Sequence, residues 1–182
     1  MSLVLGITGP NAAGKGEVSG ILAGRGFATH SLSDVVREEA AARGLPPERE
    51  HLIRIGTLLR REGGAGVLAA RLVPRIGKRD VVDSIRNPSE VAVLRALPGF
   101  VLVGVEAPAE LRFRRSRSRA RSGDPESFEG FLERERQENS SDPAGQQLAA
   151  TFALADRVIV NDGDLDALRQ RVDALLTSLK VG

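Results

Sequence analysis

The sequence predicts an α/β fold in three layers, with a five-stranded parallel sheet between two layers of helices. Short apolar runs of strand length alternate along the chain with longer stretches of helical period, the pattern that βαβ units produce. The first apolar run leads directly into a glycine-rich turn and then a helix. At 182 residues the chain is long enough to bury its own core, and we expect residues 1–182 to form one domain.

Composition excludes several classes of protein. Hydrophobic residues make up 41% and charged residues 27% of the chain, which is typical of globular proteins in water. The chain has no cysteine, so disulfides, thiolate metal sites and cysteine nucleophiles are excluded. No apolar run reaches the roughly 20 residues that cross a bilayer, and the first residues are interrupted too early by Gly6 to form a signal peptide. We therefore expect a cytoplasmic protein that binds no membrane.

The individual elements follow from the periodicity and from the turn residues between apolar runs. The candidate strands are Leu3–Thr8, Phe27–Ser31, Val81–Asp83, Phe100–Val105 and Arg157–Val160. A first helix is expected from the glycine-rich turn to about Leu22, and a second runs to Arg43 with Ser33 or Asp34 as its cap. A helix that begins at Ala109 is expected to break at residues 122–125. The other expected helices are Glu48–Arg61, Val67–Ile76, Asn87 to about Leu97, Ser127–Glu138, Gln146–Leu154 and Leu165–Leu179.

The glycine-rich turn has the pattern Gly-x-x-x-x-Gly-Lys between a strand and a helix, which is the pattern of a phosphate-binding P-loop. Its glycines let the backbone curl so that N–H groups face phosphate oxygens, and the helix amino terminus adds its dipole. Lys15 is expected to reach the β- and γ-phosphates of a nucleoside triphosphate. The residues expected to bind this cofactor are Gly9, Asn11, Ala12, Ala13, Gly14, Lys15, Gly16 and Glu17.

Two residues depart from the common P-loop. Gly16 stands where a serine or threonine hydroxyl usually contacts Mg²⁺, and Glu17 follows it. A carboxylate beside a triphosphate is unfavourable unless it faces away or meets the metal. The sequence therefore predicts triphosphate binding and leaves open how Mg²⁺ is held.

The Gly14-Lys15-Gly16 stretch resembles the adenylate-kinase branch of P-loop proteins, and more stretches in the same order resemble small adenylate-kinase-related proteins. Those stretches are residues 33–39, 59–64, 81–86, 112–115, 119–124 and 155–161. The resemblance covers nearly the whole chain. It implies ATP and Mg²⁺ as cofactors, a small-molecule nucleotide as substrate, an acceptor-binding helical segment at about residues 33–66 and a lid at about residues 113–139. We expect a monomer or a homodimer.

The same resemblance assigns the acceptor side. It implies that Arg86 clamps the acceptor phosphate, that Asp83 holds Mg²⁺ through water, and that Arg37 grips the acceptor, with Arg60 joining it. The alternatives are a helix-capping Asp83 with a surface Arg86, and a surface ion pair between Arg37 and Asp34, three residues apart on one helix. Asp34 is also where a catalytic base would lie if the acceptor were a hydroxyl group, as in dephospho-CoA kinases.

Six arginines lie between residues 112 and 121, in a chain whose net charge is only +2. Arg115 and Arg119 are four residues apart and share a helix face. They are expected to close over the triphosphate as part of the lid and to stabilise the charge in transfer. A solvated basic helix and a nucleic-acid patch are the alternatives, and the acidic residues between 126 and 138 argue against nucleic acid. The resemblance also implies that the loop after the last strand, which begins at Asn161, passes the adenine base and contacts its edge through backbone groups. The alternative is an ordinary turn with Asp164 as helix cap.

Together these residues favour an enzyme that transfers the γ-phosphoryl group of ATP to a nucleoside or deoxynucleoside monophosphate. The predicted catalytic residues are Lys15, Asp83, Arg86, Arg115 and Arg119. A phosphate acceptor is already ionised at neutral pH, so no base is required. Two alternatives stay open: transfer to a ribose hydroxyl of the dephospho-CoA kinase type with Asp34 as base, and a nucleotide-binding regulator with little catalysis. The sequence does not choose among AMP, CMP, dCMP and other acceptors.

Overall fold

The computed structural model describes residues 2–119 and 125–180 of the chain, with the side chain of Lys180 left out. Five strands form one sheet in the order β2-β3-β1-β4-β5, and all four strand pairs are parallel. The strands are β1 (Leu3–Thr8), β2 (Ala28–Ser31), β3 (Arg79–Asp83), β4 (Phe100–Glu106) and β5 (Arg157–Val160). The predicted α/β fold with a five-stranded parallel sheet is confirmed.

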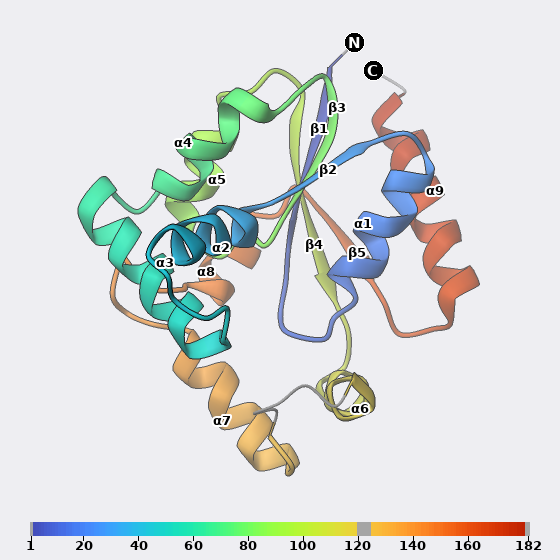
Figure 1. The fold of residues 1–182 in the computed structure, drawn as a ribbon. Coiled ribbons are helices and arrows are strands. Elements are labelled where there is room, and N and C mark those ends of the chain that lie inside the picture. Colours follow the sequence, from blue (N-terminus) through green and yellow to red (C-terminus); the bar gives the residue numbers. More distant parts are fainter. Residues whose placement is uncertain (1, 120–124, 181–182) are drawn as a thin grey trace.

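Helices cover both faces of the sheet (Figure 1). On one face lie α1 (Lys15–Gly24) and α9 (Leu165–Lys180), and on the other lie α2 (Leu32–Ala42), α3 (Arg49–Gly63), α4 (Val67–Leu72), α5 (Pro88–Leu94) and α8 (Leu148–Phe152). The remaining two, α6 (Ala109–Arg119) and α7 (Phe128–Glu138), lie beyond the carboxyl ends of the strands.

The sheet residues explain why both faces are covered. Successive side chains of a strand point to opposite faces, and in β1 Val4 belongs to the core under α2–α5 while Leu5 belongs to the core under α1 and α9. In β4, likewise, Leu102 belongs to the core under α2–α5 and Val103 to the core under α1 and α9. A strand buried on both faces must be apolar throughout, as the sequence predicts.

Several predicted helix ends were wrong for local reasons. Ser31, and not Ser33 or Asp34, caps α2, because the Ser31 hydroxyl accepts a hydrogen bond from the Ser33 amide at 3.2 Å. The helix predicted over Val67–Ile76 ends at Leu72 and continues as a 3₁₀ turn, η1 (Val73–Arg75), which contains Pro74. A proline inside a helix removes a backbone donor.

Two further helices are shorter than predicted, and one predicted break lies largely outside the described residues. The helix starting after Asn87 ends at Leu94, and the one predicted over Gln146–Leu154 is confined to α8. Of the predicted break at residues 122–125, only Pro125 is described. Among the described helices, none is long and apolar enough to span a bilayer.

The sheet brings two loops together at its carboxyl edge. In the β1–β3 pair Gly6 lies opposite Val82, so the loops after these strands are neighbours. The Thr8 hydroxyl, which is buried, donates to the Ile85 carbonyl oxygen at 2.9 Å and fixes this juxtaposition. The loop after β1 is the glycine-rich turn, and the loop after β3 leads to Arg86.

Candidate functional site

The glycine-rich loop after β1 can form only with glycine at two of its positions. Gly9 and Gly14 have φ angles of 142° and 101°, which side-chain-bearing residues rarely adopt. A Cβ atom would also lie 2.0 Å from the Val105 carbonyl oxygen at Gly9, and 2.1 Å from the Asn161 amide nitrogen at Gly14. Ala12 adopts a φ of 60° without being glycine. The loop therefore has a tightly curled backbone that its neighbours hold in place.

Lys15, the first residue of α1, folds back over this loop. Its ammonium group donates to the carbonyl oxygens of Gly9 and Pro10, each at 2.9 Å. Burial and, to a smaller extent, the charge of Arg86 together lower the pKa of Lys15 to about 8, while the charge of Asp83 acts in the opposite direction. Within the described part of the chain, the hydrogen bonds of Lys15 go to carbonyl oxygens and none goes to a carboxylate, so this ammonium group is suited to receive an anion.

The loop after β3 supplies a carboxylate and a second half-buried cation. Asp83 accepts a hydrogen bond from the Ser84 amide at 2.5 Å, and Ser84 has a φ of 66°. Arg86 donates to the Gln146 side-chain oxygen at 3.0 Å. Burial lowers the pKa of Arg86, and the charge of Glu138 opposes this effect. The two predicted residues Asp83 and Arg86 therefore lie at the same edge of the sheet as Lys15.

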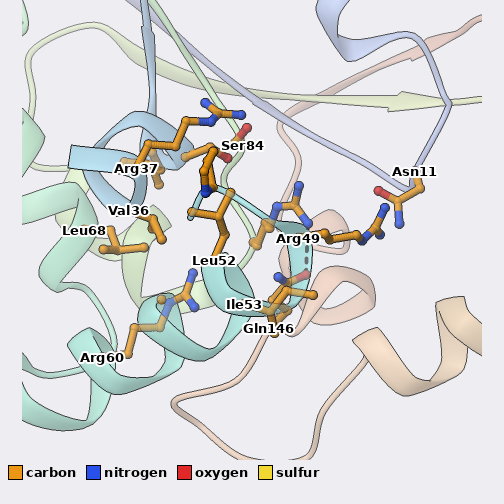
Figure 2. Close-up of a pocket in the computed structure, with 15 residues that line it drawn as sticks. Asn11, Val36, Arg37, Arg49, Leu52, Ile53, Arg60, Leu68, Ser84 and Gln146 are labelled. Carbon is orange, nitrogen blue, oxygen red and sulfur yellow. Dashed lines mark hydrogen bonds between the residues drawn. The ribbon is translucent and has the colours of Figure 1, made fainter. Parts of the chain in front are cut away.

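Two cavities meet at these residues. The P-loop cavity, of about 340 Å³, is lined by the glycine-rich loop, Lys15, Asp83 and Arg119. The α2–α3 cavity, of about 280 Å³, lies between those two helices and the loop after β3 (Figure 2). Six residues line both cavities: Asn11, Ser33, Arg37, Arg49, Ser84 and Arg86. The wall between the cavities is thus made mainly of cations and polar groups.

The other predicted acceptor residues lie at this second cavity or outside it. Arg37 lines both cavities and also forms the predicted ion pair with Asp34 at 2.6 Å, with both side chains more than half exposed. Asp34 lines neither of the two cavities. Arg60 lines the α2–α3 cavity and pairs with Glu90, their side chains being only 4% and 0% exposed.

The arginine-rich helix α6 is tied to the glycine-rich loop and to α7. Arg112, which is buried, donates to the Asn11 carbonyl oxygen at 3.3 Å and forms an ion pair with Glu135 of α7. The ring of Phe113 packs against those of Phe128 and Phe131, with ring centres 5.7 Å apart in both pairs. The two helices thus cover the P-loop cavity together. Arg121, the last of the six arginines, lies outside the described residues.

Asn161 joins β5 to the glycine-rich loop. It is buried, and its side-chain amide donates to the Ala13 carbonyl oxygen at 2.8 Å. Arg115 donates to the Asn161 backbone oxygen at 3.0 Å. Arg115, Arg119 and Asn161 all line a third cavity of about 330 Å³. Asp164 accepts from the Ala167 amide at 2.8 Å and so caps α9, as the alternative for this loop anticipated.

Sequence reasoning missed Glu138 and Arg49. The Glu138 carboxylate, only 8% exposed, accepts from the Asn11 side-chain amide at 2.5 Å and forms an ion pair with Arg49. The negative charge of Glu138 also acts to raise the pKa of Lys15 and the pKa of Arg86. No local signal could have identified this contact, because Asn11 and Glu138 are 127 residues apart. The described residues hold no cluster of three or more His, Cys, Asp or Glu side chains that could bind a metal.

The chain is similar along its length to proteins of several archaea. A UPF0200 protein of Hyperthermus butylicus is 36% identical over 181 residues, covering 97% of this chain and 95% of the relative. A UPF0200 protein of Methanoregula boonei is also 36% identical, covering 97% of both chains. No protein-family model matches the sequence.

Solved structures share the fold. The crystal structure of TT1252 from Thermus thermophilus is 25% identical, with a TM-score of 0.62 and 98% of each chain covered. Shikimate kinase from Bacteroides thetaiotaomicron is 12% identical, with a TM-score of 0.65 over the whole of both chains. Shikimate kinase from Acinetobacter baumannii, in complex with shikimate, is 20% identical with a TM-score of 0.62, covering 100% of this chain and 97% of that one. At these identities the two shikimate kinases show a common P-loop kinase fold.

Proposed function

Since this chain belongs to the UPF0200 protein family and has the fold of small P-loop kinases, we propose that it transfers the γ-phosphoryl group of ATP to a nucleoside or deoxynucleoside monophosphate. The P-loop cavity would bind the triphosphate, and the α2–α3 cavity would bind the acceptor. The observation that carries this proposal is the wall that the two cavities share, because Arg86, Arg37 and Arg49 face both.

Phosphoryl transfer requires two anionic substrates to approach one another, and catalysis is mostly positioning and charge neutralisation. In this proposal Lys15 and the loop amides hold the β- and γ-phosphates. Arg86 and Arg37 hold the acceptor phosphate, and Arg119 covers the P-loop cavity from α6. Because the acceptor phosphate is ionised at neutral pH, the reaction requires no general base.

Mg²⁺ fits this arrangement with few protein ligands. Magnesium usually keeps several waters and is bound by one or two carboxylates together with substrate phosphates. Asp83 lines the same cavity as Lys15 and is the residue that would hold the ion. The ion would neutralise the developing charge on the phosphates. Glu17 of α1 and Glu135 of α7 also line this cavity.

Transfer to a hydroxyl acceptor receives less support from the geometry. That reaction benefits from a carboxylate base, and the predicted base Asp34 is 57% exposed, pairs with Arg37 and lines neither cavity. The Asp34→Ala variant tests this reading directly. Loss of phosphoryl transfer with the acceptor still bound would favour a hydroxyl acceptor over a monophosphate.

The proposal is tested by measuring ADP formation from ATP and Mg²⁺ with a panel of nucleoside and deoxynucleoside monophosphates. Turnover with at least one of them is expected, and it should be lost in Lys15→Met and Arg86→Met. The matched controls are Lys78→Met and Arg54→Met, whose side chains are exposed and line none of the cavities described above. ATP binding without turnover for any acceptor would overturn the proposal in favour of a nucleotide-binding regulator.

A further inference from the structure

Gly56 is a buried glycine in the middle of α3, a helix of 15 residues. Glycine is disfavoured in helix interiors relative to alanine, so its presence there calls for a reason. A Cβ atom at this position would lie 3.5 Å from the Arg60 NH1 nitrogen and 3.7 Å from the nearest Val36 methyl. Both are ordinary van der Waals distances. Packing against these neighbours therefore does not require glycine at position 56.

Gly56 instead lines the α2–α3 cavity beside Arg60. The Arg60 Nε and NH2 nitrogens both donate to one Glu90 oxygen, at 3.0 and 2.7 Å. The other Glu90 oxygen accepts from the backbone amides of Arg86 and Asn87, at 2.9 and 3.1 Å. The Arg60 guanidinium is thus immobilised and its charge is balanced. Within residues 2–119 and 125–180, the hydrogen bonds of Arg60 leave its NH1 nitrogen, the one nearest Gly56, unused.

The cavity has chemically different ends. In Figure 2, Arg37 and Ser84 lie at one end of the labelled side chains and Arg60 at the other, with Leu52 between them. Among the described residues that line this cavity, none is an aspartate or glutamate. An acceptor that places its phosphate by Arg37 and Arg86 would therefore extend over aliphatic side chains toward Arg60. Because Glu90 already balances the charge of Arg60, the NH1 group there suits an uncharged oxygen or ring nitrogen better than a second anion.

We propose that Gly56 and Arg60 form the recognition end of the acceptor cavity. Arg60 NH1 donates a hydrogen bond to an uncharged acceptor atom at the end of the monophosphate remote from its phosphate, and Gly56 leaves the space which that atom occupies. This inference rests on the proposed function and adds a specificity determinant to it. Glu90 is a positioning residue, since it acts through Arg60 and through the backbone at Arg86.

Gly56→Ala is the informative variant. Replacing Arg60 would leave Glu90 buried without its partner, and the protein could fail to fold for that reason alone. A methyl group at position 56 fits the protein but fills the space beside NH1. Gly20→Ala in α1 is the matched control, because Gly20 is exposed in a helix and a Cβ atom there meets nothing within 4 Å.

The experiment measures binding of AMP, GMP, CMP, UMP, their deoxy forms and inorganic phosphate to the full chain by calorimetry, together with melting temperatures. Both variants are expected to melt about 2–4 °C higher than the unmodified protein. Gly56→Ala is expected to bind the best monophosphate about tenfold more weakly, and Gly20→Ala to bind it unchanged. The affinity for inorganic phosphate should be unchanged in both, since phosphate has no remote end.

The outcomes separate this inference from the function on which it rests. Equal affinity of Gly56→Ala and the unmodified protein for the monophosphate would overturn the inference and leave the proposed function standing. A lower melting temperature of Gly56→Ala would also overturn it, because the glycine would then be needed for packing. Binding of a monophosphate without phosphoryl transfer would overturn only the proposed function. Absence of binding by all four monophosphates and by their deoxy forms would overturn both.

Discussion

Lys15 gives a prediction whose size follows directly from its surroundings. Burial, followed by the charge of Arg86, lowers the pKa of Lys15 from 10.5 to about 8. The triphosphate proposed for the P-loop cavity brings several negative charges to this ammonium group, and an opposite charge nearby raises the pKa of an amine. ATP binding is therefore expected to take up a proton wherever the pH lies above about 8 and below the pKa in the complex.

The magnitude follows from the fraction of Lys15 that is charged before ATP binds. For a pKa of about 8, this fraction falls from about three-quarters at pH 7.5 to about one-tenth at pH 9. Since the charged form is the one that binds the triphosphate, the dissociation constant for ATP should rise about eightfold over this range, or about 1.2 kcal/mol.

Calorimetry measures both quantities without depending on turnover. Titrations with ATP at pH 8, in buffers of different ionisation enthalpy, should report uptake of about half a proton. The Lys15→Met variant should bind more weakly and lose this uptake. An ATP affinity that stays constant from pH 7.5 to pH 9, with no proton taken up at pH 8, would refute the assignment of Lys15 to the triphosphate.

Three further substitutions test the surroundings of the two cavities. Arg60→Met should lower the free energy of unfolding by roughly 3–5 kcal/mol, because the Glu90 carboxylate loses its buried partner. Adding Glu90→Gln, which removes the unpaired charge and keeps an acceptor for the Arg86 and Asn87 amides, should recover much of this in urea denaturation. Asn161→Ala removes a hydrogen bond to the glycine-rich loop and should weaken ATP binding about fivefold in fluorescence titrations, with the affinity for monophosphate unchanged. Glu138→Gln removes a negative charge that contacts Asn11 and Arg49 of the shared wall and should tighten inorganic phosphate binding at least about threefold in calorimetry. Weaker binding would contradict this reasoning.

The sheet could be predicted from the sequence because its signals are local. Apolar runs such as Leu3–Thr8 are bounded by turn residues, and the glycine-rich loop follows the first of them directly. The loop's geometry also agrees with its pattern, since Gly9 and Gly14 adopt the backbone angles that glycine allows. Boundaries set by single hydrogen bonds were less predictable. Ser31 caps α2 through a contact that Ser33 or Asp34 could have made equally well on sequence grounds.

The surroundings of the candidate site depend on contacts between distant segments. Arg60 was predicted as a residue of the acceptor side, but its pairing with Glu90 joins α3 to α5 and has no sequence signature. Glu138 was one of several acidic residues on a charged helix, and only the fold brings it to Asn11 and Arg49. The roles proposed for Arg37, Arg86 and Arg119 in binding substrates stay predictions. The structure gives only where these side chains lie and which cavities they line.

The position of Glu138 has a consequence for how salt should affect binding. Its carboxylate already takes the hydrogen bond of the Asn11 amide and the charge of Arg49 at the edge of the shared wall. A phosphate group that binds to these two side chains in place of the carboxylate exchanges one anion for another at this point. The affinity of such an exchange falls far less steeply with ionic strength than the affinity of exposed cations for an anion, because salt screens exposed charges most strongly. Affinity for phosphate should therefore depend only weakly on salt in the unmodified protein, and more strongly once Glu138 is replaced by glutamine.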